Sequence, residues 1–239
     1  MFYDQNEAPG LLALERGDCL ELMRALPDKS VDMVLVDPPY GIDYQSCWKK
    51  DKSDWKPKIL NDKKPFIEFI PEVKRILSKK GTVLIFTRWD VQQIFIDKMA
   101  ESDLVPRSVI IWDKKVHGMG DLKRAYASRY ESIIFHSEEG FNFPGKRPQD
   151  ILTVQRVTPK DLVHPNEKPV ELLETLIKQC TNPGDIVLDN CMGSGSTGVA
   201  CANTGRQFIG MELDEHYFEI ARDRVERAFF KKDRSNHDQ

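Results

Sequence analysis

Four residues that could do chemistry stand directly behind an apolar run near the start of the chain. The run Val31–Val36 is typical of a buried strand, and Asp37, Pro38, Pro39 and Tyr40 follow it without a gap. The two prolines make this strand end a rigid turn that carries a hydrogen-bond acceptor and an aromatic ring. A carboxylate can accept N–H groups from an exocyclic amine while a ring stacks on the flat base that bears it. The pattern therefore indicates chemistry on the amine of a nucleobase.

A second chemical pattern combines a strand, a glycine-rich turn and a helix in the C-terminal part of the chain. The apolar run Ile186–Leu188 leads into Asp189, Asn190, Cys191, Met192, Gly193, Ser194, Gly195, Ser196 and Thr197. The glycines allow a tight turn, and the helix start offers unpaired N–H groups to an anion, either a phosphate or a carboxylate. The next strand ends near Glu212, whose carboxylate can hold two ribose hydroxyls. We interpret this turn as neither a dinucleotide fingerprint nor an ATPase phosphate loop.

The charge of the chain is unevenly distributed. The 239 residues carry a formal net charge of −3, which argues mildly against a nucleic-acid partner. Residues 49–64, however, hold seven Lys against three Asp, and residues 113–160 hold nine Lys or Arg against six Asp or Glu. Two such segments can bind phosphates, although they fit solvated surface loops equally well. Trp48 and Trp55, which lie among the lysines, fit a DNA cleft, a lid or a core.

The composition excludes several classes of protein. No apolar run approaches membrane-spanning length, and the N-terminus lacks the basic start and apolar core of a signal peptide. The five cysteines form no CxxC pair. We therefore expect a reduced, cytoplasmic protein without a metal site.

The order of the elements predicts the fold class. Strand patterns alternate with helical patterns, which indicates an α/β fold with a doubly wound, mostly parallel sheet. The expected strands are Val31–Val36, Thr82–Phe86, Ser108–Trp112, Ser132–Phe135, Ile186–Leu188 and Gln207–Gly210. The expected helices are 19–26 capped by Asp18, Phe66–Leu77 with a kink or its true start at Pro71, 90–99 capped by Asp90, Pro169–Gln179, Ser196–Asn203, and 214–228 capped by Asp214.

We expect a single domain over residues 1–230. Residues 114–160 interrupt the α/β pattern with little helical periodicity, and we interpret them as a short, loop-rich insert for target recognition. Residues 231–239 form a polar tail that we expect to fray.

Motifs in a fixed order resemble a known family. Asp37–Tyr40 resembles the DPPY catalytic motif, His164–Pro169 resembles an HPxxKP segment, and Asp189–Thr197 resembles a cofactor loop. In this order they resemble the S-adenosylmethionine-dependent DNA amino-methyltransferases of the β type, in which the catalytic motif precedes the cofactor loop. The resemblance implies a Rossmann-like fold, S-adenosyl-L-methionine as the cofactor and DNA as the partner. Trp112–Lys114 resembles the lead-in to the target-recognition insert, and Arg129–Glu131 the strand that returns from it.

The resemblance also implies roles for individual residues. The catalytic residues are Asp37, Pro38, Pro39 and Tyr40, with the Asp37 carboxylate and the Pro38 carbonyl as acceptors for the amine and the Tyr40 ring stacked on the base. The cofactor-binding residues are Asp18, Cys19, Asp37, Lys168, Asp189, Asn190, Cys191, Gly193, Ser194, Gly195, Ser196, Thr197 and Glu212, with Lys168 placed on the methionine carboxylate. In the insert, Lys114, Lys115 and Lys123 would contact phosphates, and Arg124 and Arg129 would read base edges.

One position departs from the family pattern. The family commonly has Asp-Pro-Phe before its glycine loop, where this chain has Asp189, Asn190 and Cys191. In the family, the phenylalanine packs near the methionine portion of the cofactor, and Cys191 is smaller, so the resemblance implies less packing against the cofactor here.

The expected function is site-specific methylation of the N6 amine of adenine in DNA. The alternatives are cytosine-N4 methylation, which uses the same geometry, and a catalytically weak homologue that binds nucleic acid. The aspartate of the DPPY motif favours adenine over cytosine. A homodimer and a restriction nuclease that acts on the same site are further partners that this function allows.

Overall fold

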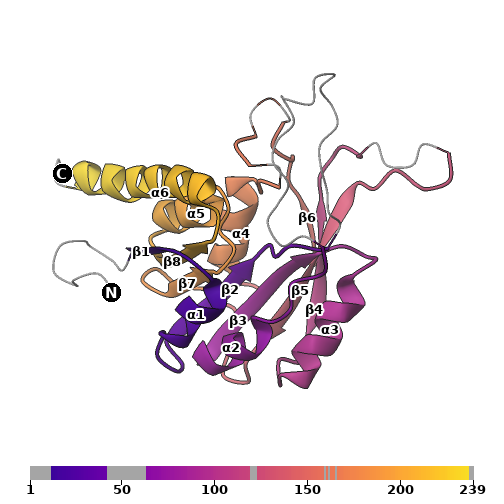
Figure 1. Cartoon of the computed structure of the whole chain (residues 1–239), viewed down its shortest axis with the longest axis horizontal. Helices are drawn as coiled ribbons and strands as arrows, with labels where there is room; N and C mark the ends of the chain where they lie inside the picture. Colours follow the sequence, from indigo (N-terminus) through magenta and orange to yellow (C-terminus); the bar gives the residue numbers. More distant parts are fainter. Residues whose placement is uncertain are drawn as a thin grey trace.

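The computed structural model is built around one mostly parallel sheet (Figure 1). It describes residues 12–41, 63–118, 123–158, 160, 162–164 and 166–236. The strands lie in the order β1 (Leu12–Arg16), β8 (Gln207–Glu212), β7 (Ile186–Asp189), β2 (Val31–Val36), β3 (Leu77–Thr87), β5 (Tyr130–Ser137), β4 (Ser108–Asp113) and β6 (Ile151–Thr153). Only β5 runs antiparallel to its neighbours β3 and β4, while the other described pairs are parallel.

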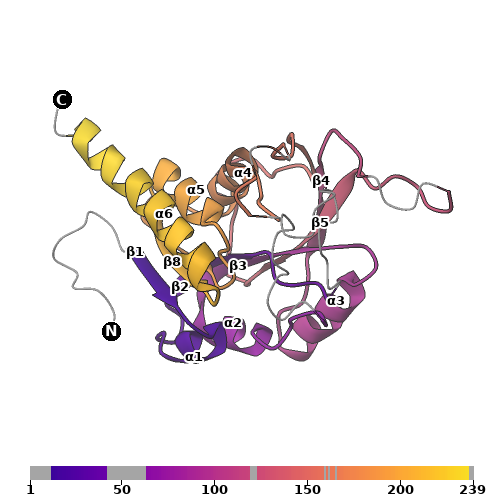
Figure 2. The same ribbon diagram turned by 45° about the horizontal axis from the view of Figure 1, so that its top comes forward.

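Helices cover both faces of the sheet, as a doubly wound fold requires (Figures 1 and 2). One layer contains α1 (Cys19–Arg24), α2 (Ile70–Ile76) and α3 (Gln92–Glu101), and the other contains α4 (Val170–Cys180), α5 (Ser196–Thr204) and α6 (Glu215–Asn236). The central strands are sandwiched between the layers, and this explains their continuous apolar runs. The expected fold class is confirmed. No helix of the described residues is long and apolar enough to cross a membrane.

Several element boundaries differ from the sequence prediction. Pro71 lies in the first turn of α2, so it marks the start of the helix rather than a kink. The cap predicted at Asp90 is wrong, because Val91 is the N-cap of α3 and Asp90 pairs with Arg88 at 2.7 Å. The tail is expected to fray from residue 231, but α6 continues to Asn236.

The segment interpreted as an insert adds two strands to the sheet. It contributes β5 and β6, while the connection between β4 and β5 projects from the sheet (Figures 1 and 2). We call the described part of this connection, residues 114–118 and 123–129, the β4–β5 arm. Backbone hydrogen bonds from Lys114 to Arg129 (3.0 Å) and from Gly118 to Ser128 (2.8 Å) hold the two sides of its base together. The other basic segment, with Trp48 and Trp55, lies outside the described residues except for Lys63 and Lys64.

A buried arginine joins the layer of helices behind the C-terminal half of the sheet. The guanidinium of Arg206, between α5 and β8, donates to the Thr181 carbonyl (2.5 Å), the Thr181 hydroxyl (3.0 Å) and the Thr204 carbonyl (2.6 Å). Thr181 ends α4 and Thr204 ends α5, so one side chain satisfies carbonyls at two helix ends. This contact fixes α5, whose start forms the glycine-rich turn.

Replacement of Arg206 by methionine should therefore destabilise the protein. The change leaves two buried carbonyls without a donor, and we expect a loss of about 2–4 kcal/mol in the free energy of unfolding in urea. Arg227→Met is the matched control, because Arg227 is an exposed residue of α6 that pairs only with Asp223 among the described ion pairs. The control should change stability by no more than about 0.5 kcal/mol. Equal stability of the two variants would contradict this role of Arg206.

Candidate functional site

A pocket opens at the carboxyl ends of the parallel strands. It lies where β2 and β7 are neighbours but the chain leaves them toward opposite edges of the sheet, the usual ligand position in such folds. The predicted site residues that line it are Asp18, Cys19, Asp37, Pro38, Pro39, Lys168, Asp189, Asn190, Cys191, Gly193, Ser194, Ser196, Thr197 and Glu212. The fold thus brings both sequence motifs to one cavity. Of the predicted catalytic and cofactor residues, Tyr40 and Gly195 are not part of the lining.

The glycine-rich turn depends on backbone that only glycine adopts easily. Gly193 and Gly195 have φ angles of +51° and +80°, in the left-handed region. A Cβ atom on Gly195 would also lie 3.0 Å from the Cα atom of Ala221 in α6. Gly198, on α5, packs equally closely against Phe208 and Val225. These three glycines have the spacing G-x-G-x-x-G, so spacing alone does not distinguish this turn from a dinucleotide fingerprint.

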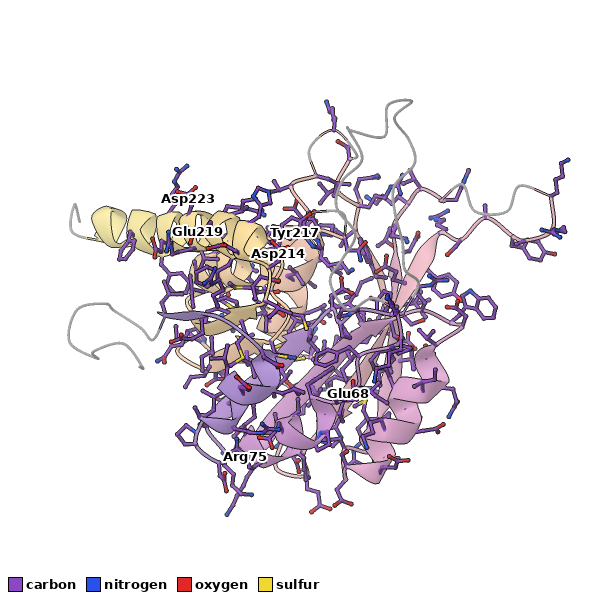
Figure 3. The ribbon with its side chains drawn as sticks, viewed as in Figure 1. Glu68, Arg75, Asp214, Tyr217, Glu219 and Asp223 are labelled. Carbon is purple, nitrogen blue, oxygen red and sulfur yellow. The ribbon has the colours of Figure 1, made fainter. Side chains whose placement is uncertain are left out.

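Glu212 holds the turn and faces the pocket from the end of β8. Its Oε2 accepts from the Gly193 N–H at 2.9 Å, and its Oε1 accepts from the Asp214 N–H at 2.8 Å. Burial raises the pKa of this carboxyl group above its usual value. Each oxygen keeps a lone pair, so the carboxylate can still accept hydrogen bonds from two hydroxyl groups. Asp214 and Tyr217 lie at the start of α6, next to this edge of the pocket (Figure 3).

The strand end before the turn carries a buried carboxyl group. Asp189 accepts from the Thr197 hydroxyl at 2.6 Å and from the Cys191 N–H at 3.1 Å, and burial raises its pKa to about 7. Beside it, the Asn190 amide nitrogen lies 3.7 Å from the sulfur of Cys19 and 3.8 Å from that of Cys191. The side-chain oxygen Oδ1 of Asn190 is buried and has no hydrogen-bond partner among the described residues. An acceptor left open in this way fits a ligand that brings its own donor into the pocket.

Asp18 has the structural role that its position predicts. Its side chain accepts from the Leu20 N–H at 2.8 Å and caps α1, while the residue also lines the pocket. A helix cap and a ligand contact are therefore compatible at this residue.

The catalytic turn predicted at the end of β2 is tightly held. The Pro39 carbonyl accepts from the Phe66 N–H at 3.0 Å, which ties the turn to the segment before α2. The Tyr40 hydroxyl donates to Oδ1 of Asp37. The Tyr40 side chain is buried, so in this structure its ring supports the turn from behind instead of facing the pocket. Its stacking on a base stays a prediction.

Lys168 makes the least expected contact of the site. Its ammonium group donates to Oδ2 of Asp37 at 2.5 Å, and Oε2 of Glu131 in β5 lies 3.3 Å from the same nitrogen. On its other side, Glu131 accepts from Lys114 at 3.1 Å. The ammonium group also lies 5.0 Å from the centre of the Phe86 ring. The sequence suggested Lys168 for the methionine carboxylate, but this structure pairs it with the catalytic motif.

The HPxxKP segment, His164–Pro169, also holds the glycine-rich turn. Oε1 of Glu167 accepts from Arg224 at 2.7 Å and lies 3.3 Å from the Ser196 hydroxyl, and Arg224 in turn donates to the Ser194 carbonyl at 2.8 Å. The His164 ring packs edge-on against the Tyr217 ring, with 4.3 Å between their centroids. Sequence reasoning missed Glu131, Glu167 and Arg224, because their partners are distant in sequence and no local motif marks them.

The predicted DNA-binding residues of the arm differ in burial and in their contacts. Arg129 forms a paired contact with the Asp113 carboxylate, with both distances 2.6 Å, and Lys114 is largely buried against Glu131. Lys115, Lys123 and Arg124 are exposed. Tyr126, which the sequence analysis did not single out, is fully exposed on the same arm.

Comparison with known proteins identifies the family. A family model described as DNA methylase, for N6 and N4 amino-methyltransferases, matches residues 31–223. The chain belongs to this family. Its members carry the expected activity class, so the chain is an S-adenosylmethionine-dependent DNA amino-methyltransferase.

Relatives span almost all of the chain. The DNA adenine methyltransferase YhdJ of Escherichia coli K12 is 27% identical and covers 93% of this chain and 84% of its own length. The putative methylase YubD of the same organism is 30% identical, with 88% of each chain covered. The solved complex of M1.HpyAVI with SAM has a TM-score of 0.67 at 26% identity, over 90% of this chain and 100% of its own. The cytosine-N4-specific PvuII methyltransferase has a TM-score of 0.69 at 17% identity and covers 95% of this chain and 96% of its own, which shows the shared fold.

The pocket fits S-adenosyl-L-methionine as the cofactor. The glycine-rich turn at Gly193 lets a ligand approach the backbone closely, and Glu212 offers a carboxylate for hydroxyl groups. The buried side-chain oxygen of Asn190 is an acceptor without a hydrogen-bond partner among the described residues. The described residues contain no group of three or more His, Cys, Asp or Glu placed to hold a metal ion.

Replacement of Glu212 by alanine should weaken binding of this cofactor. We expect a loss of about 1.5–3 kcal/mol in binding free energy by calorimetry, the scale of a hydrogen bond to a charged group. The exposed Glu219 of α6, which pairs with Arg222, supplies the control Glu219→Ala, and its affinity should equal that of the parent. Unchanged affinity of Glu212→Ala would place the ribose elsewhere in the pocket.

Proposed function

We propose that this chain methylates the exocyclic N6 amine of adenine in DNA. The observation that carries the proposal is the position of the Asp37 carboxylate, which lines the cofactor pocket at the end of β2 and lies on a turn fixed by Pro39 and Tyr40. The relative YhdJ is named a DNA adenine methyltransferase, which supports adenine as the target. Cytosine-N4 methylation is the alternative, since it needs the same acceptor at the same place.

Asp37 and the neighbouring backbone act on the amine by accepting its hydrogens. An aromatic amine is a poor nucleophile because its lone pair is delocalised into the ring. Hydrogen bonds to the Asp37 carboxylate and the Pro38 carbonyl localise this lone pair and direct it toward the methyl group. A base inside a duplex cannot reach the pocket, so the target base must be flipped out.

The chemical step needs both alignment and a group that takes up a proton. When bound, S-adenosylmethionine would supply a methyl group on a sulfonium sulfur, which would keep the electron pair of the broken C–S bond as the amine forms the new N–C bond. The methylated amine then carries a positive charge and loses one proton. Asp37 is the carboxylate nearest to that position in the proposal, and burial raises its pKa above the usual value. A base with a raised pKa accepts this proton more readily than an ordinary aspartate.

The β4–β5 arm is the proposed DNA-recognition surface. It projects from the same edge of the sheet as the pocket (Figures 1 and 2) and exposes Lys115, Lys123, Arg124 and Tyr126. Its cations suit phosphates, and Tyr126 offers a ring on which a base can stack. A homodimer and a nuclease acting on the same site stay predictions of the sequence.

The function is tested by transfer of isotope-labelled methyl groups to duplex DNA. The parent protein should yield labelled N6-methyladenine after digestion to nucleosides. The Asp37→Asn variant should transfer the label at least about 100-fold more slowly, because an amide nitrogen cannot accept the amine hydrogens. Its cofactor affinity by calorimetry should stay within about twofold of the parent, since Asp37 acts on the base.

The control for this experiment is Asp97→Asn, an exposed position on α3 that contacts Gln93. It should transfer label at the parent rate. Labelled N4-methylcytosine in place of methyladenine would establish the alternative target. Transfer by Asp37→Asn at the parent rate would refute the mechanism.

Loss of the exposed aromatic side chain on the arm should weaken DNA binding. For Tyr126→Ala we expect a loss of about 1–3 kcal/mol in binding free energy, the scale of one stacked base. Arg124→Ala should in addition lower the salt dependence of binding if this cation contacts phosphate. Both are measured by fluorescence anisotropy with labelled duplex at two salt concentrations. The control is Arg107→Ala, an exposed cation before the start of β4 and so at the opposite edge of the sheet. Parent-like binding of both arm variants would place DNA recognition elsewhere.

A further inference from the structure

Two carboxylates share a single ammonium group inside the active-site pocket. Lys168 is 8% exposed and lies 2.5 Å from Oδ2 of Asp37 and 3.3 Å from Oε2 of Glu131. These residues come from three separate parts of the fold, namely the end of β2, the start of β5 and the segment before α4. Buried charges destabilise a protein unless they are paired, so an arrangement of this kind needs a reason.

The proposed function requires Asp37 to accept a hydrogen bond from the target amine in addition to the contacts observed. Its Oδ1 already accepts from Tyr40, and its Oδ2 accepts from Lys168. Each oxygen thus already accepts one hydrogen bond, so an incoming amine must share an oxygen with the donor present there or displace that donor. On Oδ2, the donor is the ammonium group of Lys168. A displaced ammonium group needs another acceptor nearby, because a buried cation without one is strongly disfavoured.

Glu131 supplies this second acceptor. Its Oε1 is taken by Lys114, whereas its Oε2 is buried and accepts no hydrogen bond from any described residue. At 3.3 Å, the Lys168 nitrogen is close enough for attraction but does not form a hydrogen bond with this oxygen. A small movement of the ammonium group would close that gap.

We propose that Lys168 and Glu131 are positioning residues for the transfer reaction, a role that rests on the proposed function. In the free protein, Lys168 holds the Asp37 carboxylate in place through Oδ2. When the amine of the flipped base reaches Asp37, Lys168 passes its hydrogen bond to Oε2 of Glu131, and Oδ2 becomes the acceptor for the amine.

The electrostatic surroundings agree with this division of roles. Burial raises the pKa of Asp37, Lys168 opposes this effect and Glu131 adds to it. Burial also raises the pKa of Glu131, but the cations Lys168 and Lys114 outweigh it, so this pKa is lowered. Burial lowers the pKa of Lys168, and the two carboxylates outweigh it. Glu131 is thus kept as a charged partner while Asp37 is kept ready to take up a proton.

Two further groups face Asp37 and do not change this picture. Tyr40 lies on the same turn, and its pKa is raised well above the usual value, mainly by burial, so its hydroxyl stays a donor. Asp189 at the end of β7 is a second buried carboxyl group whose pKa is raised by burial and, to a smaller extent, by Asp37. Both groups remain in every variant proposed below.

The test compares Lys168→Met, Lys168→Arg and Glu131→Gln with the parent. The first readout is the titration of the Asp37 carboxyl group in the free protein, followed by NMR with ¹³C-labelled aspartate and assigned with Asp37→Asn. The second is the pH dependence of kcat for methyl transfer, and the third is cofactor affinity by calorimetry. Lys178→Met on α4 is the matched control, because Lys178 is an exposed lysine paired with Glu174 at 3.2 Å.

The two charge changes should move the Asp37 titration in opposite directions. Lys168→Met removes the cation, so the carboxyl group should titrate about one pH unit or more higher, and the acid limb of kcat should move up with it. Glu131→Gln removes the like charge, so both should move down. Lys168→Arg keeps the positive charge, so the Asp37 carboxyl group should titrate as in the parent. Cofactor affinity should stay within about twofold of the parent in all three variants. The Lys178→Met control should leave all three readouts unchanged.

Other outcomes would overturn the proposal. If Lys168→Met weakens cofactor binding about tenfold or more and leaves the Asp37 titration unchanged, Lys168 binds the methionine carboxylate instead. If it lowers only the melting temperature, its role is structural. Should Lys168→Met not fold, the titrations of Lys168→Arg and Glu131→Gln still decide, and an unshifted Glu131→Gln titration refutes the proposal. The NMR readout needs no turnover, so failure of the parent to methylate DNA would overturn the proposed function separately.

Discussion

The ion pair between Lys168 and Asp37 is the contact on which the arrangement of the site depends. It joins the turn after β2 to the segment before α4, and these parts of the chain are 131 residues apart. The glycine-rich turn is tied to the same segment through Glu167 and Arg224. The carboxylate proposed to act on the base and the glycine-rich turn are therefore positioned from one short stretch of chain. Buried charged contacts of this kind require accurate geometry, because each unpaired partner would be strongly destabilising.

The parallel sheet makes this convergence possible. The ends of β2 and β7 lie side by side, and helices on both faces bury their apolar residues. Polar side chains at a strand end lie at the edge of a rigid core. The core fixes their positions, and they remain accessible to a ligand. In this protein, the carboxylates Asp37 and Asp189 lie at the carboxyl ends of the adjacent strands β2 and β7. Their partners differ, because Asp37 pairs with a lysine and Asp189 accepts from a threonine hydroxyl.

Much of the fold could be predicted from local patterns. The apolar run before Asp37, the glycine turn at Gly193 and the helix stop at Gly205 each have a physical cause within a few residues. The contacts of Lys168 could not be predicted in this way, because Asp37 and Glu131 reach it only through the order of the strands. The burial of Tyr40 depends in the same way on the segment around Pro65, with which it forms a β-bridge. The exposed Tyr126 had no local signal, since an aromatic residue in a loop fits a packed position equally well.

The central claim is that the target amine takes the place of Lys168 on Asp37. The most direct measurement is a crystal structure of the protein with a non-reactive analogue of S-adenosylmethionine and an unmethylated duplex that contains the site methylated by the protein. The account predicts the amine nitrogen of a flipped adenine within about 3 Å of Oδ2 of Asp37, with the Lys168 nitrogen moved to hydrogen-bond distance from Oε2 of Glu131. A flipped base whose amine contacts neither oxygen of Asp37, with Lys168 still bound to that carboxylate, would contradict the account.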